Sequence, residues 1–198
     1  GDTIFFIAAP EKAACIYAGQ IRNELGSRLD LLEKDAYRFC YINDFPMYEI
    51  DEETGKLGFT HNPFSMPQGG LEALNEKDPL DILAYQYDIV CNGVELSSGA
   101  VRNHDMEIME KAFDIAGYDK ETLKDKFGAL YNAFQFGAPP HAGMAPGVDR
   151  MIMLLRNEEN IREIIAFPMS GTAQDLMCGA PNEITEQQLR EVHIKVRD

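Results

Sequence analysis

Basic residues are scarce in this chain: 18 Lys and Arg stand against 33 Asp and Glu, for a net charge of −15 over 198 residues. A surface built for broad contact with nucleic acid needs clustered Lys and Arg, so the composition argues against that class of protein. Long apolar runs are also missing. No run approaches the roughly 20 residues that a membrane-spanning helix needs, and no signal peptide is visible. We therefore expect no association with a membrane.

Cysteines are few and widely spaced, at positions 15, 40, 91 and 178. None forms the C-x-x-C spacing that is typical of zinc and redox sites. Cys15, Cys40 and Cys91 lie among apolar neighbours, so we expect them to be buried free thiols. Free thiols persist in a reducing compartment, and the sequence therefore predicts a cytoplasmic protein.

A length of 198 residues allows one domain with a small addition, and a hydrophobic content of 45% is enough for a core. It opens without an initiator Met on an apolar run, Thr3 to Ala8, that we expect to be a strand. A helix is expected to follow from Pro10. We interpret the chain as a piece of a longer polypeptide.

Strand and loop patterns follow. Residues 37–43 are expected to form a strand that ends at Asp44-Phe45-Pro46. Residues 47–50 and 57–60 flank a polar turn and predict a hairpin. The segment 65–81, rich in Gly, Pro and charge, is either a mobile lid or an ordinary connector.

Helical patterns dominate the next part of the chain. Asn103 or Asp105 can cap a helix that runs through Ile115, and Asp119 can cap another that ends near Phe136. A strand that turns into a helix is expected around Met144 to Arg150. The pattern alone indicates a mixed α and β fold with hairpins.

The central stretch, Tyr85 to Arg102, is an apolar strand that contains Asp88, Glu95 and Arg102. Buried strands seldom carry such residues unless they are paired or bind a charged ligand. The three residues are spaced seven apart, which in a flat strand puts neighbours on opposite faces. A turn or bulge at Asn92-Gly93, and again at Ser98-Gly99, would bring them to one face.

Two carboxylates and a guanidinium on one face would favour particular ligands. Two carboxylates suit a hard cation such as Mg²⁺, and a guanidinium suits bidentate capture of a carboxylate. An internal salt bridge from Arg102 to Glu95 or Asp88 is the alternative. A second anion site is expected at Gly147-Val148-Asp149-Arg150, where a helix N-terminus carries an Arg. The alternative there is a surface pair between Asp149 and Arg150.

Four ordered motifs resemble bacterial-type aspartyl-tRNA synthetase, a class II aminoacyl-tRNA synthetase. They are Asp88 with Asn92-Gly93, Glu95, Gly99 and Arg102; His61-Asn62-Pro63-Phe64; Phe136-Gly137-Ala138-Pro139-Pro140-His141; and Gly147-Val148-Asp149-Arg150. The resemblance runs over nearly the whole chain. It implies an α+β fold, the class II core with an antiparallel sheet flanked by helices. Residues 1–30 would be the tail of the bacterial insertion domain, and residues 31–198 the C-terminal half of the catalytic domain.

The resemblance also implies the ligands. L-aspartate and ATP would react to aspartyl-adenylate, and the aspartyl group would pass to tRNA, in an enzyme that is a homodimer at full length. His61 and Arg102 would bind L-aspartate; Glu95, Gly147, Val148, Asp149 and Arg150 would bind ATP; Asp88 and Glu95 would bind Mg²⁺. No residue is assigned a catalytic role apart from binding.

The chain departs from the family pattern at two places. Asn62 stands where the family has a second His, and Gly171-Thr172 stands where most members have Gln-Arg. The first and second signature motifs and the anticodon-binding barrel are missing, so we expect this polypeptide alone to be nearly inactive. Whether the full enzyme also charges tRNA(Asn) stays open. The alternatives are an asparagine synthetase on the same fold that activates aspartate, and a non-catalytic module that binds aspartate or a nucleotide.

Overall fold

The computed structural model describes residues 2–197 and divides the chain into two compact units, one up to Arg38 and the other from Phe39 onward. The first unit contains one helix, α1 (Glu11–Arg28), with no buried residue. The strand expected at Thr3 to Ala8 is wrong: these residues have no regular secondary structure, and Ile4, Phe5 and Phe6 are exposed. A strand needs a partner strand for its backbone groups, and none in the described chain pairs with this run.

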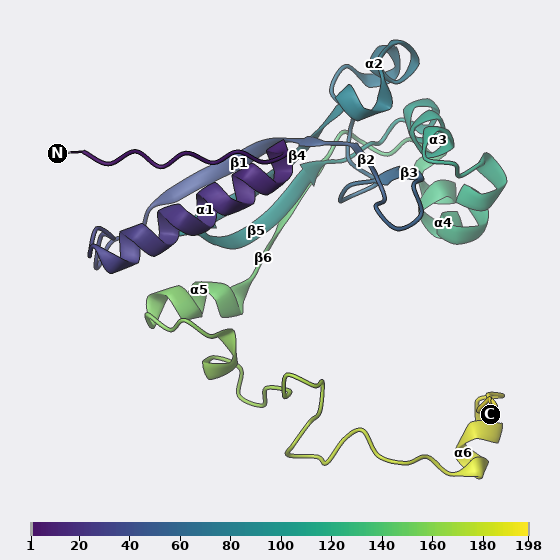
Figure 1. Ribbon diagram of the computed structural model, residues 1–198. Helices are drawn as coiled ribbons and strands as arrows, with labels where there is room; N and C mark the ends of the chain where they lie inside the picture. Colours follow the sequence, from purple (N-terminus) through teal and green to yellow (C-terminus); the bar gives the residue numbers. More distant parts are fainter. Residues whose placement is uncertain (1, 198) are drawn as a thin grey trace. The chain divides into compact units, whose positions relative to one another are not determined.

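The second unit is built on a four-stranded antiparallel sheet in the order β1-β4-β5-β6 (Figure 1). Its strands are β1 (Phe39–Pro46), β4 (Leu83–Cys91), β5 (Val94–Val101) and β6 (Ala142–Pro146). Helices pack at one end of this sheet, so the expected α+β class with an antiparallel sheet is confirmed.

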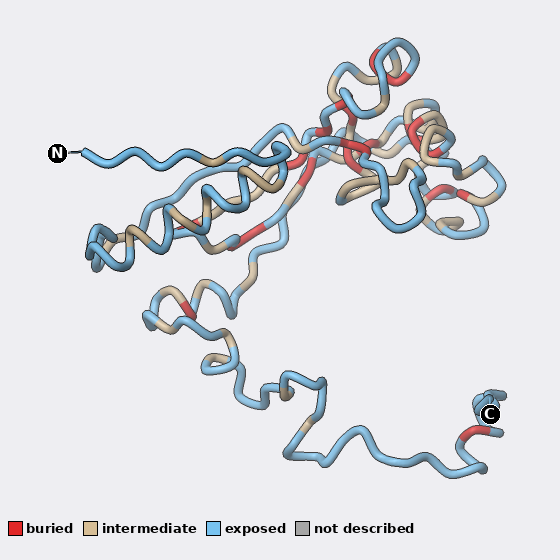
Figure 2. Tube along the Cα trace, in the orientation of Figure 1, coloured by how far each residue is buried: buried red, intermediate tan, exposed pale blue. Residues whose placement is uncertain are grey.

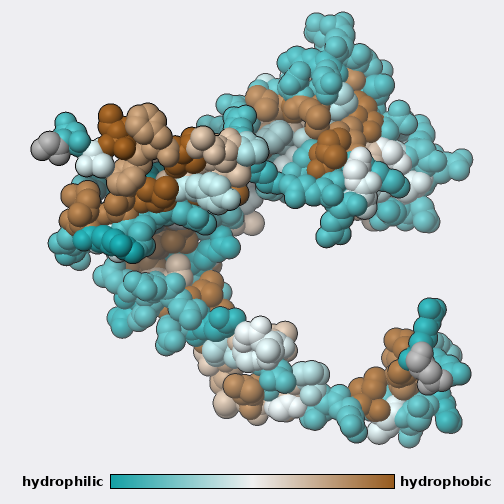
Figure 3. All heavy atoms as spheres, in the orientation of Figure 1, coloured by the Kyte–Doolittle hydropathy of each residue, from teal (hydrophilic) through white to brown (hydrophobic). Residues whose placement is uncertain are grey.

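Strand β1 runs further than its sequence predicts. It does not end at Asp44 but continues through Pro46, with a register shift against β4 between Asn43 and Phe45. The extra residue is in β4, where Tyr85 and Gln86 stand opposite Asp44 alone, and Asp44 has a φ of 59°. β1 is an edge strand, which is where a sheet tolerates Pro. The strand also exposes Phe39 and Tyr41, and Figure 3 shows that apolar side chains reach the surface on the face drawn.

The predicted hairpin is confirmed as β2 (Tyr48–Ile50) paired with β3 (Leu57–Phe59). Asp51 organises its turn, because its Oδ1 accepts hydrogen bonds from the Thr54 amide at 2.6 Å and the Thr54 hydroxyl at 2.8 Å. These bonds hold the pKa of Asp51 below its ordinary value.

The segment 65–81 is not a structureless lid. It contains helix α2 (Gly70–Glu76) and a 3₁₀ turn, η1 (Pro79–Asp81). Its start is attached to the sheet, since Ser65 bridges to Arg102 and Pro67 bridges to Ala84. Both Ser65 and Pro67 are fully buried. The connector reading therefore fits this part of the chain, and the lid reading does not.

The two helices expected after the central stretch are α3 (Met106–Ile115) and α4 (Lys120–Phe134). Asp105 caps α3 by accepting from the amides of Glu107 and Ile108, and Asp119 caps α4 by accepting from the Thr122 amide. The apolar faces of these helices pack on the β2–β3 hairpin.

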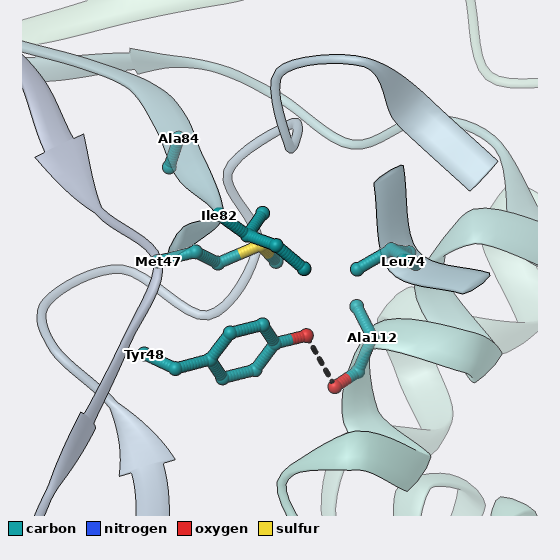
Figure 4. Close-up of a cluster of buried hydrophobic side chains, with 6 residues drawn as sticks. All are labelled: Met47, Tyr48, Leu74, Ile82, Ala84 and Ala112. Atoms are coloured by element: carbon teal, nitrogen blue, oxygen red, sulfur yellow. Dashed lines mark hydrogen bonds between the residues drawn. The ribbon is translucent and has the colours of Figure 1, made fainter. Parts of the chain in front are cut away.

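The core lies where these helices meet the sheet and the hairpin, as the buried positions in Figure 2 show. One cluster is drawn in Figure 4 and consists of Met47, Tyr48, Leu74, Ile82, Ala84 and Ala112. The Tyr48 hydroxyl donates to the main-chain oxygen of Ala112 at 2.9 Å, which satisfies a polar group inside this cluster. A second cluster, Met109, Phe113, Leu123 and Tyr131, joins α3 to α4.

The chain continues through α5 (Val148–Leu155), a 3₁₀ turn η2 (Ile161–Glu163) and α6 (Glu186–Glu191). Helix α6 begins with a capping box formed by Thr185 and Gln188. Within residues 2–197, no helix is both long and apolar enough to cross a membrane.

The cysteines differ from expectation. All four are free thiols, but only Cys91 is buried, whereas Cys15, Cys40 and Cys178 are exposed. Cys15 lies on a helix that buries nothing, and Cys40 lies on the edge strand, so apolar neighbours in sequence did not mean burial.

Candidate active site

A bulge in β5 brings the two carboxylates of the central stretch to one face of the sheet. Asn92 and Gly93 form the two-residue turn between β4 and β5, with φ values of 50° and 81° that suit a hairpin of this type. The pairing then shifts by one residue between Val90↔Glu95 and Ile89↔Ser97. Leu96 is therefore the extra residue, and Glu95 faces the same side as Asp88.

One of the two irregularities expected from the sequence, the one at Ser98-Gly99, lies elsewhere in β5. Ser98 and Gly99 are in regular register, paired with Asp88 and Tyr87. The shift lies at Leu96 instead, which is 6% exposed. Leu96 is not among the residues that line the cavity, and the burial of its apolar side chain favours the bulge.

The residues brought together surround one cavity of about 520 Å³. Its lining comprises Phe45, His61, Asn62, Gln86, Asp88, Glu95, Ser98, Gly99, Arg102, Gly143, Met144 and Ala145. Four of the eight residues singled out from the sequence thus share it: His61, Asp88, Glu95 and Arg102. Strands β4, β5 and β6 form its floor.

Arg102 lies at the end of β5 and is held on both sides by main-chain contacts. Its amide donates to the oxygen of His141 at 2.9 Å, and the amide of the next residue donates to the oxygen of Phe64 at 2.7 Å. In the described part of the chain, its guanidinium forms no ion pair with Glu95 or Asp88 within 4.0 Å. The internal salt bridge considered from the sequence is therefore not the observed arrangement, and the charge stays available to a ligand.

Arg150 attaches the start of α5 to the bulge. Its Nη1 donates to the main-chain oxygen of Glu95 at 2.7 Å and lies 3.4 Å from the Glu95 carboxylate. The Gly147 amide donates to the Leu96 oxygen at 2.7 Å. Arg150 thus pairs with Glu95, not with Asp149 as the surface-pair alternative required. Val148 and Asp149 are exposed, and neither they nor Gly147 line the cavity.

His61 is positioned by an aromatic contact and by the segment that follows it. The rings of Phe45 and His61 meet edge-on with centroids 5.1 Å apart. Phe45 follows Asp44, whose carboxylate accepts a hydrogen bond from Gln68 Nε2 at 2.7 Å. The register shift between β1 and β4 therefore lies next to the ring against which His61 packs.

The carboxylates that line the cavity are those of Asp88 and Glu95. Among residues 2–197, no group of three or more His, Cys, Asp or Glu side chains is placed to hold a metal ion. Mg²⁺ typically uses one or two carboxylates and completes its shell with water and substrate phosphates. A pair of carboxylates in an open cavity fits that mode, and it does not fit a dedicated protein cage.

Among the residues that sequence reasoning missed are Gln86, which lines the cavity, and Tyr87, which supports the sheet beneath it. Gln86 lies two residues before Asp88 on the same face and is 7% exposed. Tyr87 lies on the opposite face, and its hydroxyl donates to the Gly143 oxygen at 3.0 Å. Strand alternation from Asp88 could have identified Gln86, but nothing in the sequence marks the contact of Tyr87 with β6.

Comparison with known proteins gives a consistent result. The family model for class II tRNA synthetases (D, K and N) matches residues 11–171. The chain is 60% identical over 195 residues to an aspartate–tRNA(Asp/Asn) ligase of Zymomonas mobilis, covering 98% of this chain and 33% of that protein. It is 61% identical over 197 residues to an aspartate–tRNA ligase of Streptomyces avermitilis, covering 100% and 34%.

The fold comparison agrees. An aspartyl-tRNA synthetase structure from Entamoeba histolytica matches with a TM-score of 0.51 and 26% identity, over 88% of this chain and 29% of that one. The chain spans about a third of the length of the curated relatives it matches.

Proposed function

The chain belongs to the class II tRNA synthetases (D, K and N), and we propose that it is part of an aspartate–tRNA ligase. The full enzyme would activate L-aspartate with ATP to aspartyl-adenylate and transfer the aspartyl group to tRNA(Asp), with tRNA(Asn) as a further acceptor to be tested. Residues 1–30 would belong to an insertion domain and residues 31–198 to the catalytic domain. The working assembly would be a cytoplasmic homodimer.

The proposal rests on the surroundings of the Arg102 guanidinium. A guanidinium that lines a cavity and has no carboxylate partner in the described chain needs an anion to compensate its partial burial. The planar guanidinium can donate two parallel hydrogen bonds to the side-chain carboxylate of aspartate. His61, on the neighbouring wall, would contact the same amino acid.

The nucleotide would lie toward the other end of the cavity. Asp88 and Glu95 would hold Mg²⁺ against the phosphates, and the metal would neutralise charge as the leaving group departs. Arg150 and the start of α5 at Gly147, Val148 and Asp149 would bind the terminal phosphate, because helix N-termini attract anions. Catalysis of this kind depends on positioning and charge, so no side chain needs to act as a nucleophile.

The test is ATP–pyrophosphate exchange with the full-length protein. Wild type should exchange only when aspartate is added and should then form aspartyl-tRNA. Arg102→Ala should lose aspartate-dependent exchange by two or more orders of magnitude, since a site built for a polar group rejects a ligand that it cannot pair. Arg22→Ala, an exposed change on α1, is the matched control.

Two outcomes would contradict the proposal. Exchange that does not depend on aspartate would remove the substrate assignment. Aspartate-dependent turnover that yields asparagine from ammonia, with no charged tRNA, would identify the asparagine synthetase alternative. The isolated 198-residue chain should show little or no exchange in the same assay, and robust exchange would refute that expectation.

A further inference from the structure

The cavity wall contains one buried polar side chain to which the proposed chemistry gives no role, that of Gln86. It is 7% exposed and lies on β4. Its Nε2 donates to the main-chain oxygen of Asn62 at 3.4 Å. Its Oε1 accepts no hydrogen bond from any residue between 2 and 197. This oxygen is not among the described buried atoms that lack a partner, so it is open to the cavity, where a ligand that brings a donor can replace water.

The hydrogen bond to Asn62 decides which end of the amide faces the ligand. Because Nε2 is engaged with a carbonyl, the free end of Gln86 is its oxygen, an acceptor. Asn62 is itself fixed, since its Oδ1 accepts from the Phe64 amide at 2.9 Å. The acceptor of Gln86 therefore has a set orientation and cannot be exchanged for a donor by rotation of the amide without breaking this contact.

The register places Gln86 between the two charged ends of the cavity. Gln86 pairs with Ala100, and Asp88 pairs with Ser98. Arg102 follows two residues after Ala100 on the same face. Neighbours on one face of a strand are about 7 Å apart along it. Gln86 thus lies one step from the guanidinium and one step from the first carboxylate.

We propose that Gln86 is a specificity-determining residue that accepts a hydrogen bond from the ammonium group of the bound amino acid. The inference rests on the proposed function, in which Arg102 holds the side-chain carboxylate of aspartate. The ammonium nitrogen of that aspartate is three bonds from the side-chain carboxylate carbon, so it extends from Arg102 toward the next residue on that face, which is at the level of Gln86. An ammonium group has donors only, which matches the single free acceptor that Gln86 offers.

The experiment compares aspartate with succinate, which is the same dicarboxylate without the ammonium group. Both are measured by calorimetry on the full-length protein, together with the KM for ATP. In Gln86→Met, a change that keeps the side-chain volume, the affinity for aspartate should fall by about tenfold or more, as for the loss of a hydrogen bond to a charged group. The affinity for succinate and the KM for ATP should stay within twofold (roughly the scatter of contacts that do not change).

A second variant and a control keep the test decisive. Gln86→Glu keeps an acceptor, so it should retain or increase the preference for aspartate over succinate, and it decides the question if Gln86→Met does not fold. Gln187→Met, an exposed change on α6, should alter neither affinity. Equal weakening of both ligands in Gln86→Met, or a reduced preference in Gln86→Glu, would overturn the inference. If wild type does not activate aspartate, the proposed function itself fails.

Discussion

The ring of Tyr87 lies directly on Gly99 of the neighbouring strand, so that a Cβ at Gly99 would come within 2.5 Å of Tyr87 Cε2. The same Cβ would also lie 2.5 Å from the main-chain oxygen of Gly143. Tyr87 reaches across this glycine to donate its hydroxyl to that oxygen at 3.0 Å. The contact joins three strands beneath the cavity, and only a residue without a side chain can lie at its centre.

This relationship predicts a large effect of a small change. Gly99→Ala should move Tyr87 or separate β5 from β6, at a cost of about 1–3 kcal/mol for overpacking. The midpoint of urea unfolding measures it. Gly143→Ala is the matched control, because nothing lies within 4 Å of a Cβ there. Equal losses in the two variants would show that strand glycine itself, and not the contact with Tyr87, is responsible.

A second prediction concerns Arg150. Its side chain contacts the main chain and the carboxylate of Glu95, next to the proposed phosphate site. Arg150→Ala in the full-length protein should raise the KM for ATP by roughly tenfold or more, as for the loss of a hydrogen bond to a charged group. The affinity for aspartate should change little. Pyrophosphate exchange at varied ATP and varied aspartate measures both, and an effect on aspartate alone would contradict the assignment.

A third prediction concerns Tyr48 in the core. Its hydroxyl donates to the Ala112 oxygen, and Tyr48 itself is 1% exposed. Tyr48→Phe should reduce the free energy of unfolding by about 1 kcal/mol, the usual net value of such a hydrogen bond. Tyr41→Phe, on the exposed face of β1, should have no measurable effect. Chemical unfolding of the two variants, followed side by side, provides the comparison.

The same tyrosine should make stability depend on alkaline pH. Burial raises the pKa of Tyr48 above its ordinary value of 10.0. A group whose pKa is higher in the folded state stabilises the fold fully below the unfolded pKa, and this contribution is lost as the pH rises through the folded pKa. Wild type should therefore lose stability above about pH 10 more steeply than Tyr48→Phe does. Parallel curves for the two proteins would contradict this.

A fourth prediction concerns the link between α3 and α4. Tyr131 donates to Glu110 at 2.5 Å, and Lys120 lies 2.8 Å from the same carboxylate. Burial by itself would raise the pKa of Glu110, but the bonds from Lys120 and Tyr131 outweigh it and hold the pKa below its ordinary 4.5. The contribution of Glu110 to stability should be present above pH 4.5 and lost as the pH falls through the lower, folded pKa.

Thermal unfolding across this acidic range tests the link. Glu110→Gln should melt a few degrees below wild type at neutral pH, and the difference should disappear once the carboxylate of wild type is protonated. Glu121→Gln, an exposed change on α4, is the control. A difference between Glu110→Gln and wild type that persisted unchanged at low pH would show that packing, and not the charge, is what the substitution removes.

Local signals in the sequence predicted much of the second unit. Asp105 and Asp119 mark their helices because a short acceptor side chain satisfies amides that no helix can satisfy internally. Asn92-Gly93 marks the hairpin turn because both positions need a positive φ. These signals act over a few residues, so they could be interpreted without knowledge of the partner elements.

Other features depended on which elements pack together. The run Thr3 to Ala8 has the composition of a strand, but no strand in the described part of the chain pairs with it. Cys40 has apolar neighbours but lies on an edge strand and is exposed. The segment 65–68 is rich in turn formers, but hydrogen bonds from the sheet hold it against β4 and β5. In each case burial and pairing came from distant residues, which a local pattern does not record.

For the site itself, the sequence alone determined the chemical types: two carboxylates, one guanidinium, one imidazole, and a helix start with an arginine. The tertiary structure decided that the carboxylates share a face, because one buried apolar residue, Leu96, is an extra residue in β5 and shifts the register by one. It also decided that, among residues 2–197, Arg150 has a carboxylate partner and Arg102 has none. Both outcomes depend on strand register, which is set by packing across the whole sheet and not by the residues of any one strand.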